Sequence, residues 1–492
     1  MRLLRQYFVL PRNDKLFLLR TFTWMLKYNS MSNFQLITDQ DIIKGFCTDS
    51  SNYPGFAEAL VRPKSVSDVV EVVKEANSKK ISITTIGNRS SLTGSAAASG
   101  GWILDTSQMI KIFEINTKEK FAVAEPGMML SDFKKTILEQ GVFYAPDPTS
   151  EKECFFGGSI ATNASGSRTF KYGSTRKYVR SLEVVLASGE VLNIRRPEIE
   201  KNTFGYLPFQ NMVDIFTGSE GTLGIITKAE VQLLEKPENF FGGMAFFRTL
   251  SEALNFVINI RRELSRQFPA VTPRAVELFD NHGLNIIRPD STFKIPNSAQ
   301  AAIFFEQEYR TEEFESLLNN WLSFLEVNKA IVDDTIIAEQ PKQQEELRTL
   351  RHKVPSHLFE EGGKFVKDGG GKISTDWSVP VNKIHEMIDY AQKLAKETKI
   401  EDPVIYGHIG NGHPHYNFIA KNSAQKKQIL DVVHKTCQKA VSLGGTIAAE
   451  HGIGKIKKDF VKYQYPQTVI NAMKALKHSL DPNGILAPGN MF

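Results

Sequence analysis

The sequence concentrates histidine in one short stretch, where His408, His413 and His415 lie within residues 406–415. The side chains of His408 and His415 would point to opposite faces of a straight strand, but the Gly-Asn-Gly and the proline between them can turn the chain so that both rings converge. Imidazole is a common metal ligand. The stretch therefore predicts either a metal site or structural histidines with ordinary hydrogen-bond partners.

A carboxylate and a further imidazole follow downstream, in the pair Glu450-His451. Oxidation of an alcohol needs one group that holds and polarises the oxygen and a second group that takes its proton. Glu450 offers a carboxylate ligand, and His451 offers an unligated imidazole. The alternative interpretation is a Glu-His turn that only caps the neighbouring backbone.

Three glycine-rich loops form a second candidate site. Residues 87–94 follow a predicted strand and can point several backbone N–H groups at a pyrophosphate. In residues 146–150 and 156–166 the small side chains allow a flat ring and its ribityl chain to lie against the backbone, and residues 218–227 end in a strand whose edge can bond a heterocycle. A single loop of this kind is weak evidence, because glycine turns after strands are common. Three in order favour a bound cofactor.

The elements that must position these residues change in type along the chain. Ser65 is a plausible N-cap for an amphipathic helix between two strands, and this α/β pattern closes near residue 235. Residues 145–173 are too long and too rich in glycine for a spacer, so we expect a functional loop there. Beyond Pro237 the pattern indicates an α+β domain. The expected strands are 60–63, 81–86, 102–105, 121–125, 181–187, 190–194, 240–248 and 301–308, and the expected helices include 131–140, 250–266, 311–327 and 381–398.

Composition and charge exclude several classes of protein. The chain has 492 residues, 41% hydrophobic and 23% charged, which excludes disordered and disulfide-scaffold classes. Residues 1–30 carry the whole net charge of +5, and the remainder is neutral. A nucleic-acid partner is therefore not expected, because its binder would carry a basic face on the folded body. The cysteines, Cys47, Cys154 and Cys437, form no CxxC pair, which favours reduced thiols.

Residues 1–30 have three interpretations: an Arg-rich targeting peptide, an amphipathic anchor, or an extension upstream of a second start at Met31. Charged residues interrupt every apolar run before it reaches 18 residues, so we expect no transmembrane helix. Peripheral membrane contact stays open. We expect a cytoplasmic location, or a mitochondrial one in a eukaryote.

The order and residues of these motifs resemble those of the vanillyl-alcohol-oxidase superfamily, in the branch of D-lactate dehydrogenases, glycolate oxidase large subunits and D-2-hydroxyglutarate dehydrogenases. The resemblance runs from about Tyr53 to the C-terminus and is most specific in residues 157–166 and 218–227. It implies a two-subdomain FAD-binding domain at 51–235, after an extension at 1–50, and an α+β substrate (cap) domain at 236–492 whose C-terminal segment contacts FAD. It is not a Rossmann fold. The implied FAD contacts are Gly87, Asn88, Arg89, Ser90, Ser91, Gly94, Pro148, Thr149, Ser150, Gly157, Gly158, Ser159, Thr162 and Ile225.

The resemblance also implies the roles of the polar residues. Carried over by position, His408, His415 and Glu450 would hold a divalent metal, zinc or manganese. By the same resemblance His451 would be the base and Arg351 would clamp a substrate carboxylate. The chain departs from the family at Asn411 and His413, where Asp and Asn are usual, and at Asn88 and Arg89, where glycines are usual. Arg89 either bonds the pyrophosphate or reshapes the loop. No His or Cys stands in that loop to bind flavin covalently.

The implied activity is oxidation of a small D-2-hydroxy acid, D-lactate-like, to the 2-oxo acid, with hydride transfer to flavin N5. A quinone, a cytochrome or an electron-transfer flavoprotein would re-oxidise the flavin. Two alternatives stay open: a transferase like the alkyldihydroxyacetonephosphate synthases, and a flavin- or metal-binding protein without turnover. A homodimer is compatible with the sequence.

Overall fold

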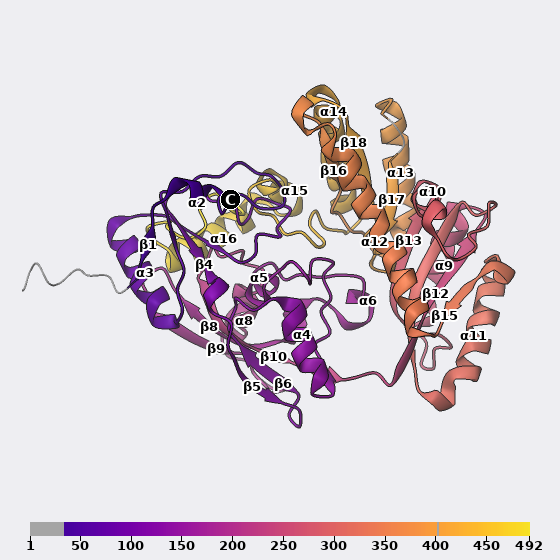
Figure 1. The fold of residues 1–492 in the computed structure, drawn as a ribbon, viewed down its shortest axis with the longest axis horizontal. Coiled ribbons are helices and arrows are strands. Elements are labelled where there is room, and N and C mark those ends of the chain that lie inside the picture. The colour runs from indigo at the N-terminus through magenta and orange to yellow at the C-terminus, as the bar shows by residue number, and fades with distance from the viewer. Residues whose placement is uncertain (1–33, 401–402) are drawn as a thin grey trace, which may run out of the picture.

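The computed structural model describes residues 34–400 and 403–492, so the interpretations of residues 1–30 lie outside the described part. Two bodies stand side by side in Figure 1: an N-domain, residues 34–235, and a cap domain, residues 236–447. The C-terminal segment, residues 448–492, leaves the cap domain and returns to the N-domain. The expected α+β fold with a separate second domain is confirmed. Within the described residues, no helix combines the length and the apolar character that a bilayer span requires.

The first sheet of the N-domain has the strand order β1-β2-β4-β3, and β2, β4 and β3 run parallel. Helix α3 (Val66–Lys79) begins where predicted, because the Ser65 hydroxyl accepts the N–H of Asp68 at 3.3 Å. The valines of α3 recur at helical spacing and are buried against the sheet. The strands are β1 (Leu36–Ile37), β2 (Ala59–Val61), β3 (Ile83–Ile86) and β4 (Trp102–Asp105), and a short helix α2 (Gln40–Lys44) follows β1.

The second sheet of the N-domain is antiparallel, in the order β5-β6-β10-β8-β9, and helices α4 and α5 lie close to it (Figure 1). The expected functional loop at 145–173 is only partly irregular, because it contains α5 (Phe156–Ala161) and α6 (Thr169–Tyr172). The elements are β5 (Ile112–Asn116), β6 (Phe121–Ala124), β8 (Val179–Val185), β9 (Val191–Arg195), β10 (Ile225–Gln232) and α4 (Leu130–Glu139), with α7 (Leu207–Gln210), α8 (Val213–Phe216) and the pair β7 (Val142–Phe143) and β11 (Leu234–Glu235) at its margin.

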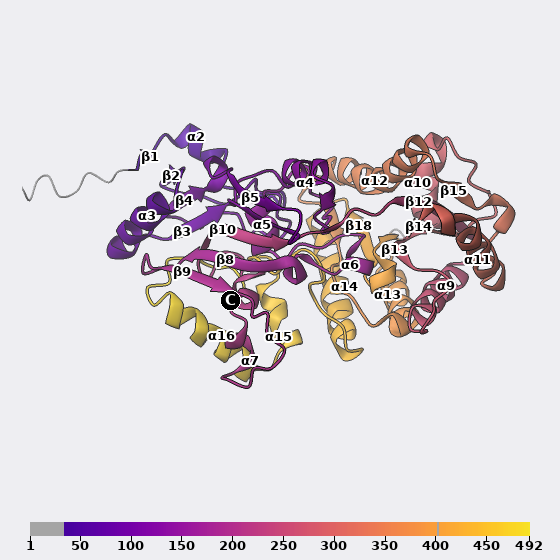
Figure 2. The same cartoon turned by 90° about the horizontal axis from the view of Figure 1, so that it is seen from below.

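The cap domain is built on one sheet in the order β15-β12-β14-β13-β17-β18-β16, covered by helices (Figure 2). Strand β13 (Pro273–Asp280) is buried along its whole length, although it carries Arg274 and Glu277. The other strands are β12 (Asn239–Phe247), β14 (Ala301–Tyr309), β15 (Ile336–Ala338), β16 (Gly371–Ser374), β17 (Val404–Gly407) and β18 (His415–Ala420). The helices are α9 (Leu250–Glu263), α10 (Asn281–Ile287), α11 (Phe314–Val327), α12 (Pro341–Gly363), α13 (Ile384–Glu397) and α14 (Ser423–Ser442).

The C-terminal segment completes the core of the N-domain. Ile485 and Leu486 are buried beside α3, and Ile83 bonds the backbone on both sides of Leu486, at 2.6 and 2.8 Å. The helices of the segment, α15 (Val461–Gln464) and α16 (Gln467–Leu480), lie against the N-domain in both views (Figures 1 and 2). The segment therefore connects the two domains after residue 447.

Buried ion pairs, which we call the ionic junction, also hold the two domains together. Arg168 of the N-domain bonds Glu306 of β14 at 2.9 Å, and Arg274 of β13 bonds the same carboxylate at 2.7 Å. Nearby, Lys171 and Tyr172 of α6 both bond Glu308. Burial disfavours the charge of Glu306, but Arg168 and Arg274 hold the pKa of that carboxyl well below its ordinary value.

Candidate metal and cofactor site

The hairpin β17–β18 brings His408 and His415 together. His408 follows the end of β17, the chain turns through a 3₁₀ turn (Ile409–Asn411) and a left-handed Gly412, and His415 begins β18 opposite Tyr406. Glycine is required at position 412, because a Cβ there would lie 1.9 Å from the Val379 carbonyl oxygen. The turn places both rings on the same side.

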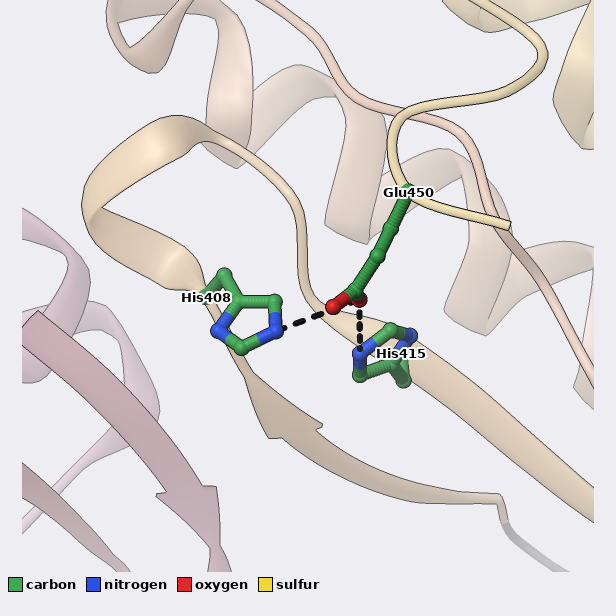
Figure 3. Close-up of side chains that lie close together, drawn as sticks. All are labelled: His408, His415 and Glu450. Atoms are coloured by element: carbon green, nitrogen blue, oxygen red, sulfur yellow. Dashed lines mark ion pairs between the residues drawn. The ribbon is translucent and has the colours of Figure 1, made fainter. Parts of the chain in front are cut away.

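Glu450 reaches these rings from the C-terminal segment, as Figure 3 shows. Its Oε2 lies 3.2 Å from His408 Nε2 and 3.6 Å from His415 Nε2, and the donor atoms of the three residues lie within 4.8 Å of one another. Burial alone would raise the pKa of Glu450, but His408 and His413 hold it well below its ordinary value. Burial also keeps the pKa of His415 well below its ordinary value. The cluster therefore presents an ionised carboxylate and a neutral imidazole.

His408 is oriented by Glu277, which comes from the buried strand β13. Glu277 Oε1 lies 2.7 Å from His408 Nδ1, and Arg351 Nε and Nη2 both lie 2.8 Å from Glu277 Oε2. Burial disfavours a charged His408, but Glu277 and Glu450 raise its pKa to about 10. Arg351 thus reaches the cluster through Glu277. Sequence reasoning missed Glu277, although an acid among the apolar residues of a buried strand is the signal that would have found it.

Asp376, also missed, holds the segment that carries Glu450 and His451. Its two carboxylate oxygens each accept a backbone N–H, from Glu450 and His451, at 3.2 Å, and it pairs with Lys457. The same carboxylate lies 3.4 Å from His451 Nδ1, and the His451 ring stacks on His415 with centroids 5.7 Å apart. Burial lowers the pKa of His451, which favours the neutral imidazole that a base requires.

A second carboxylate holds the same segment from the N-domain side, and we call this contact the Glu220 clamp. Glu220 accepts the N–H of Ile453 at 2.6 Å and the N–H of Gly454 at 2.7 Å. Its own backbone is left-handed, with a φ of 52°, and its N–H bonds the carbonyl of Ala161 in α5. The clamp therefore ties the Glu450-His451 segment to two of the predicted cofactor loops. The glycine-rich loop was identified from the sequence, but the role of Glu220 was not.

The C-terminal segment also touches the remaining cofactor loop. The carbonyl of Thr93 accepts the N–H of Lys455 at 2.9 Å, and the buried Lys455 ammonium lies 3.3 Å from the Gly94 carbonyl. Asn490 bonds the carbonyls of Ser95 and Glu220, which joins the loop 87–94 to the loop 218–227. The three loops that the sequence singled out are thus assembled into one region.

Loop 87–94 is shaped by contacts of Asn88 and Arg89. Arg89 has the left-handed backbone, with a φ of 60°. Its guanidinium bonds the carbonyl of Gly45 and lies over the Phe46 ring, and a bond from Arg89 to a pyrophosphate stays a prediction. Asn88 bonds the carbonyl of Glu153 at 2.8 Å. The Ser91 hydroxyl accepts the N–H of Thr93, and Gly94 packs against Tyr53.

The loops around α5 show which glycines leave space. A Cβ on Gly157 would lie 2.3 Å from Pro126 Cβ, whereas a Cβ on Gly158 would meet no atom within 4 Å. The hydroxyls of Ser159 and Thr162 bond the helix backbone. The other predicted contacts lie nearby or on the adjoining sheet. Pro148 is buried, Thr149 is exposed, and the carbonyl of Ser150 accepts the backbone N–H groups of Glu153 and Cys154. Ser90 is half-buried beside Ser91, and Ile225 is buried at the start of β10. Gly158 therefore leaves open space beside the tightly packed Gly157, and a flat ring could lie against the backbone there.

Comparison with known proteins agrees with this architecture. Residues 57–195 match the FAD binding domain family, and residues 236–491 match the family described as FAD linked oxidases, C-terminal domain. The fold and site thus define a flavoprotein oxidoreductase. Because the second match spans more than half of the chain, this protein belongs to the FAD-linked oxidases.

Relatives with assigned names cover nearly the whole chain. This chain is 29% identical to the glycolate oxidase subunit GlcD of Bacillus subtilis, over 89% of this chain and 90% of the relative. It is 28% identical to a D-lactate dehydrogenase of Anaerostipes hadrus, over 94% of this chain and 96% of the relative. A solved alkyldihydroxyacetonephosphate synthase superposes with a TM-score of 0.71 at 20% identity, over 95% of this chain and 84% of that one, a likeness that shows the fold alone.

Proposed function

We propose that the protein is an FAD-dependent dehydrogenase that oxidises a small, D-lactate-like D-2-hydroxy acid to the 2-oxo acid. One observation carries the proposal. The short segment 450–454 presents Glu450 and His451 to His408 and His415, and the same segment is bonded through Glu220 to the cofactor loops. Groups for alcohol oxidation and loops for a flavin therefore meet at one place.

The residues that would hold FAD are those of the three loops, with Gly158 offering open space and Asn490 joining two of the loops. Bound FAD would accept the substrate hydride at N5. Binding would be non-covalent, since no His or Cys stands in loop 87–94. The contribution of the chain is to position the ring and to exclude water around it.

His408, His415 and Glu450 would hold a divalent ion, for which we propose zinc or manganese. Their donor set fits, because imidazole and carboxylate suit both ions and the donor atoms of the three residues lie within 4.8 Å of one another. Such an ion would polarise the substrate hydroxyl. Glu277 orients His408 as carboxylates commonly orient metal-ligating histidines.

His451 would act as the base. Asp376 can only accept, so it favours the tautomer that carries the proton on His451 Nδ1 and leaves the Nε2 lone pair for the hydroxyl proton. Once His451 is protonated, Asp376 and Glu450, which lies 3.9 Å from Nε2, stabilise its charge. His451 would thus hold the proton while the hydride leaves.

Arg351 would bind the substrate carboxylate. Glu277 engages Nε and Nη2, so Nη1 is the atom that we assign to the substrate. Electrons would leave the flavin for a quinone, a cytochrome or an electron-transfer flavoprotein. We propose a cytoplasmic location, or a mitochondrial one in a eukaryote.

Anaerobic reduction of the bound flavin tests the proposal. D-lactate, D-2-hydroxyglutarate or glycolate should bleach the flavin absorbance of the wild type. His451→Gln should keep the yellow colour but lose this bleaching by about a hundredfold or more, since general-base catalysis contributes about 10²–10⁴-fold. The control is His357→Gln on the exposed face of α12, which should behave as wild type. Colourless protein that FAD cannot reconstitute, or unchanged reduction in His451→Gln, would refute the flavin or the base assignment respectively.

A further inference from the structure

Tyr406 of β17 lies next to the metal cluster, two residues before His408 in the chain. In the sheet it pairs with Phe279 of β13 on one side and with His415 of β18 on the other. The centroids of its ring and of the His415 ring are 5.5 Å apart. Because directly opposed residues of neighbouring strands point to the same face of a sheet, Tyr406 borders the residues that would hold the ion.

Helix α12 covers this face of the sheet and confines the Tyr406 ring. Tyr406 packs against an apolar cluster that includes Leu350 and Val354 of α12. From the same stretch of the helix, Arg351 bonds Glu277 of β13. The charges of Arg351 and Glu277 both act on the Tyr406 phenol. The phenol therefore lies between α12 and the sheet, where Arg351 reaches the cluster.

The hydroxyl of Tyr406 forms no hydrogen bond with any residue that the structure describes. Tyr416 of the same hairpin differs in this respect. It packs on the opposite face of the sheet, and its hydroxyl donates to the carbonyl of Ile388 at 3.3 Å. A phenylalanine would fill the space of the Tyr406 ring equally well. Because tyrosine hydroxyls away from bulk water usually find a partner, an unbonded one beside charged groups points to a ligand.

Arg351 by itself would leave a substrate carboxylate half bound. Glu277 engages its Nε and Nη2, so the two-pronged pairing of a guanidinium with both carboxylate oxygens is not available, and Nη1 remains. The other carboxylate oxygen needs a second donor. Glu277 and Glu450 cannot supply it, because ionised carboxylates only accept.

We propose that the Tyr406 hydroxyl donates a hydrogen bond to the second carboxylate oxygen of the 2-hydroxy acid, beside Arg351 Nη1. This role rests on the proposed function and deepens it by adding a substrate-binding residue. A phenol is protonated at neutral pH, so it donates without adding a charge to the pocket. Two contacts fix the orientation of the carboxylate, whereas one contact leaves it free to turn.

Anaerobic stopped-flow reduction of the FAD-loaded protein tests the proposal, with whichever of D-lactate, glycolate and D-2-hydroxyglutarate reduces the wild type fastest. The dependence of the rate on substrate concentration gives the dissociation constant and the limiting rate separately. In Tyr406→Phe we expect the dissociation constant to rise about tenfold or more, as for the loss of a hydrogen bond to a charged group. The limiting rate should change by less than about threefold.

Further measurements tell a carboxylate contact from other roles. Propionate has the carboxylate but no 2-hydroxyl, so its inhibition constant should rise by the same factor in Tyr406→Phe. The affinity for Zn²⁺, measured in competition with a chromogenic chelator, should not change. Stability in urea should also match the wild type, because the removed hydroxyl has no protein partner. The control Tyr416→Phe loses a bond to the backbone, so it should lose stability and keep the wild-type dissociation constant.

The outcomes separate this role from the proposed function. If the wild type is reduced and Tyr406→Phe binds both the substrate and propionate as tightly, the contact is overturned and the function stands. Weaker binding of Zn²⁺, or of the hydroxy acid but not propionate, would assign the hydroxyl to the metal ligands or to the substrate hydroxyl, and would also overturn the contact. If none of the three acids reduces the wild type, the proposed function fails, and the contact with it.

Discussion

Two of the contacts that join the N-domain to the rest of the chain are built from different chemistry. The ionic junction pairs charged side chains, with Arg168 and Arg274 sharing Glu306. The Glu220 clamp pairs one carboxylate with two neutral backbone donors of the C-terminal segment. The first contact balances charge between the domains, whereas the second determines the position of a few backbone atoms next to His451. We therefore expect the ionic junction to govern stability and the Glu220 clamp to govern activity.

The largest expected effect on stability is at the ionic junction. Glu306→Gln removes the carboxylate that Arg168 and Arg274 share and leaves them only longer pairs with Asp147 at 3.6 Å and Glu308 at 3.4 Å. The free energy of unfolding should fall by about 3 kcal/mol, the lower end of the cost of breaking a buried ion pair. Urea unfolding followed by tryptophan fluorescence measures it. The variant, once folded and loaded with FAD, should still be reduced by substrate. A stability equal to that of the wild type would contradict the role of the junction.

A smaller loss of stability, with a larger loss of activity, is expected at the clamp. Glu220→Gln keeps one acceptor oxygen but turns an amide N–H toward a backbone N–H, which should cost about 1–3 kcal/mol. Because His451 then moves more freely, we expect flavin reduction to slow by about tenfold, measured by stopped-flow absorbance.

The matched control for the clamp is Glu230→Gln, a buried carboxylate in the same domain that bonds Arg195 on the sheet. It should lose stability while retaining the wild-type rate of flavin reduction. Equal rates in the two variants would show that the clamp acts only on stability.

The two contacts should also differ in acid. The folded pKa of Glu306 is depressed, so its stabilising contribution is present above the unfolded value of about 4.3 and is lost as the pH falls through the folded value. Burial raises the pKa of Asp147 beside it, which opposes this loss in part. The free energy of unfolding should therefore fall below about pH 4.3 in the wild type and fall less steeply in Glu306→Gln. If the free energy of unfolding falls with pH equally steeply in both proteins, Glu306 is not the cause of the loss of stability in acid.

The smallest effect is expected where an ion pair joins elements on the surface. Lys120 bonds Glu235, whose side chain is 81% exposed, so water screens the pair. Glu235→Gln should leave unfolding and flavin reduction unchanged. A measurable destabilisation here would weaken the argument that burial explains the size of the Glu306 effect.

Sequence patterns predicted the elements well where local signals dominate. The N-cap Ser65, the helix that follows it and strand β4 lie where predicted, because capping and periodicity are local. The stretch 145–173 was predicted as a loop and contains two short helices, since the small residues of α5 pack tightly against Pro126, a contact that only the tertiary structure forms.

The sequence by itself determined the residue types that chemistry needs: the histidines near the hairpin, the Glu450-His451 pair and the glycine loops. It could do so because motif spacing is written along the chain. Only the tertiary structure decided how they are held, since Glu277, Asp376 and Glu220 come from distant elements and bond partners 74 to 234 residues away in the chain. Such pairings depend on the packing of whole domains, and no local pattern encodes that packing.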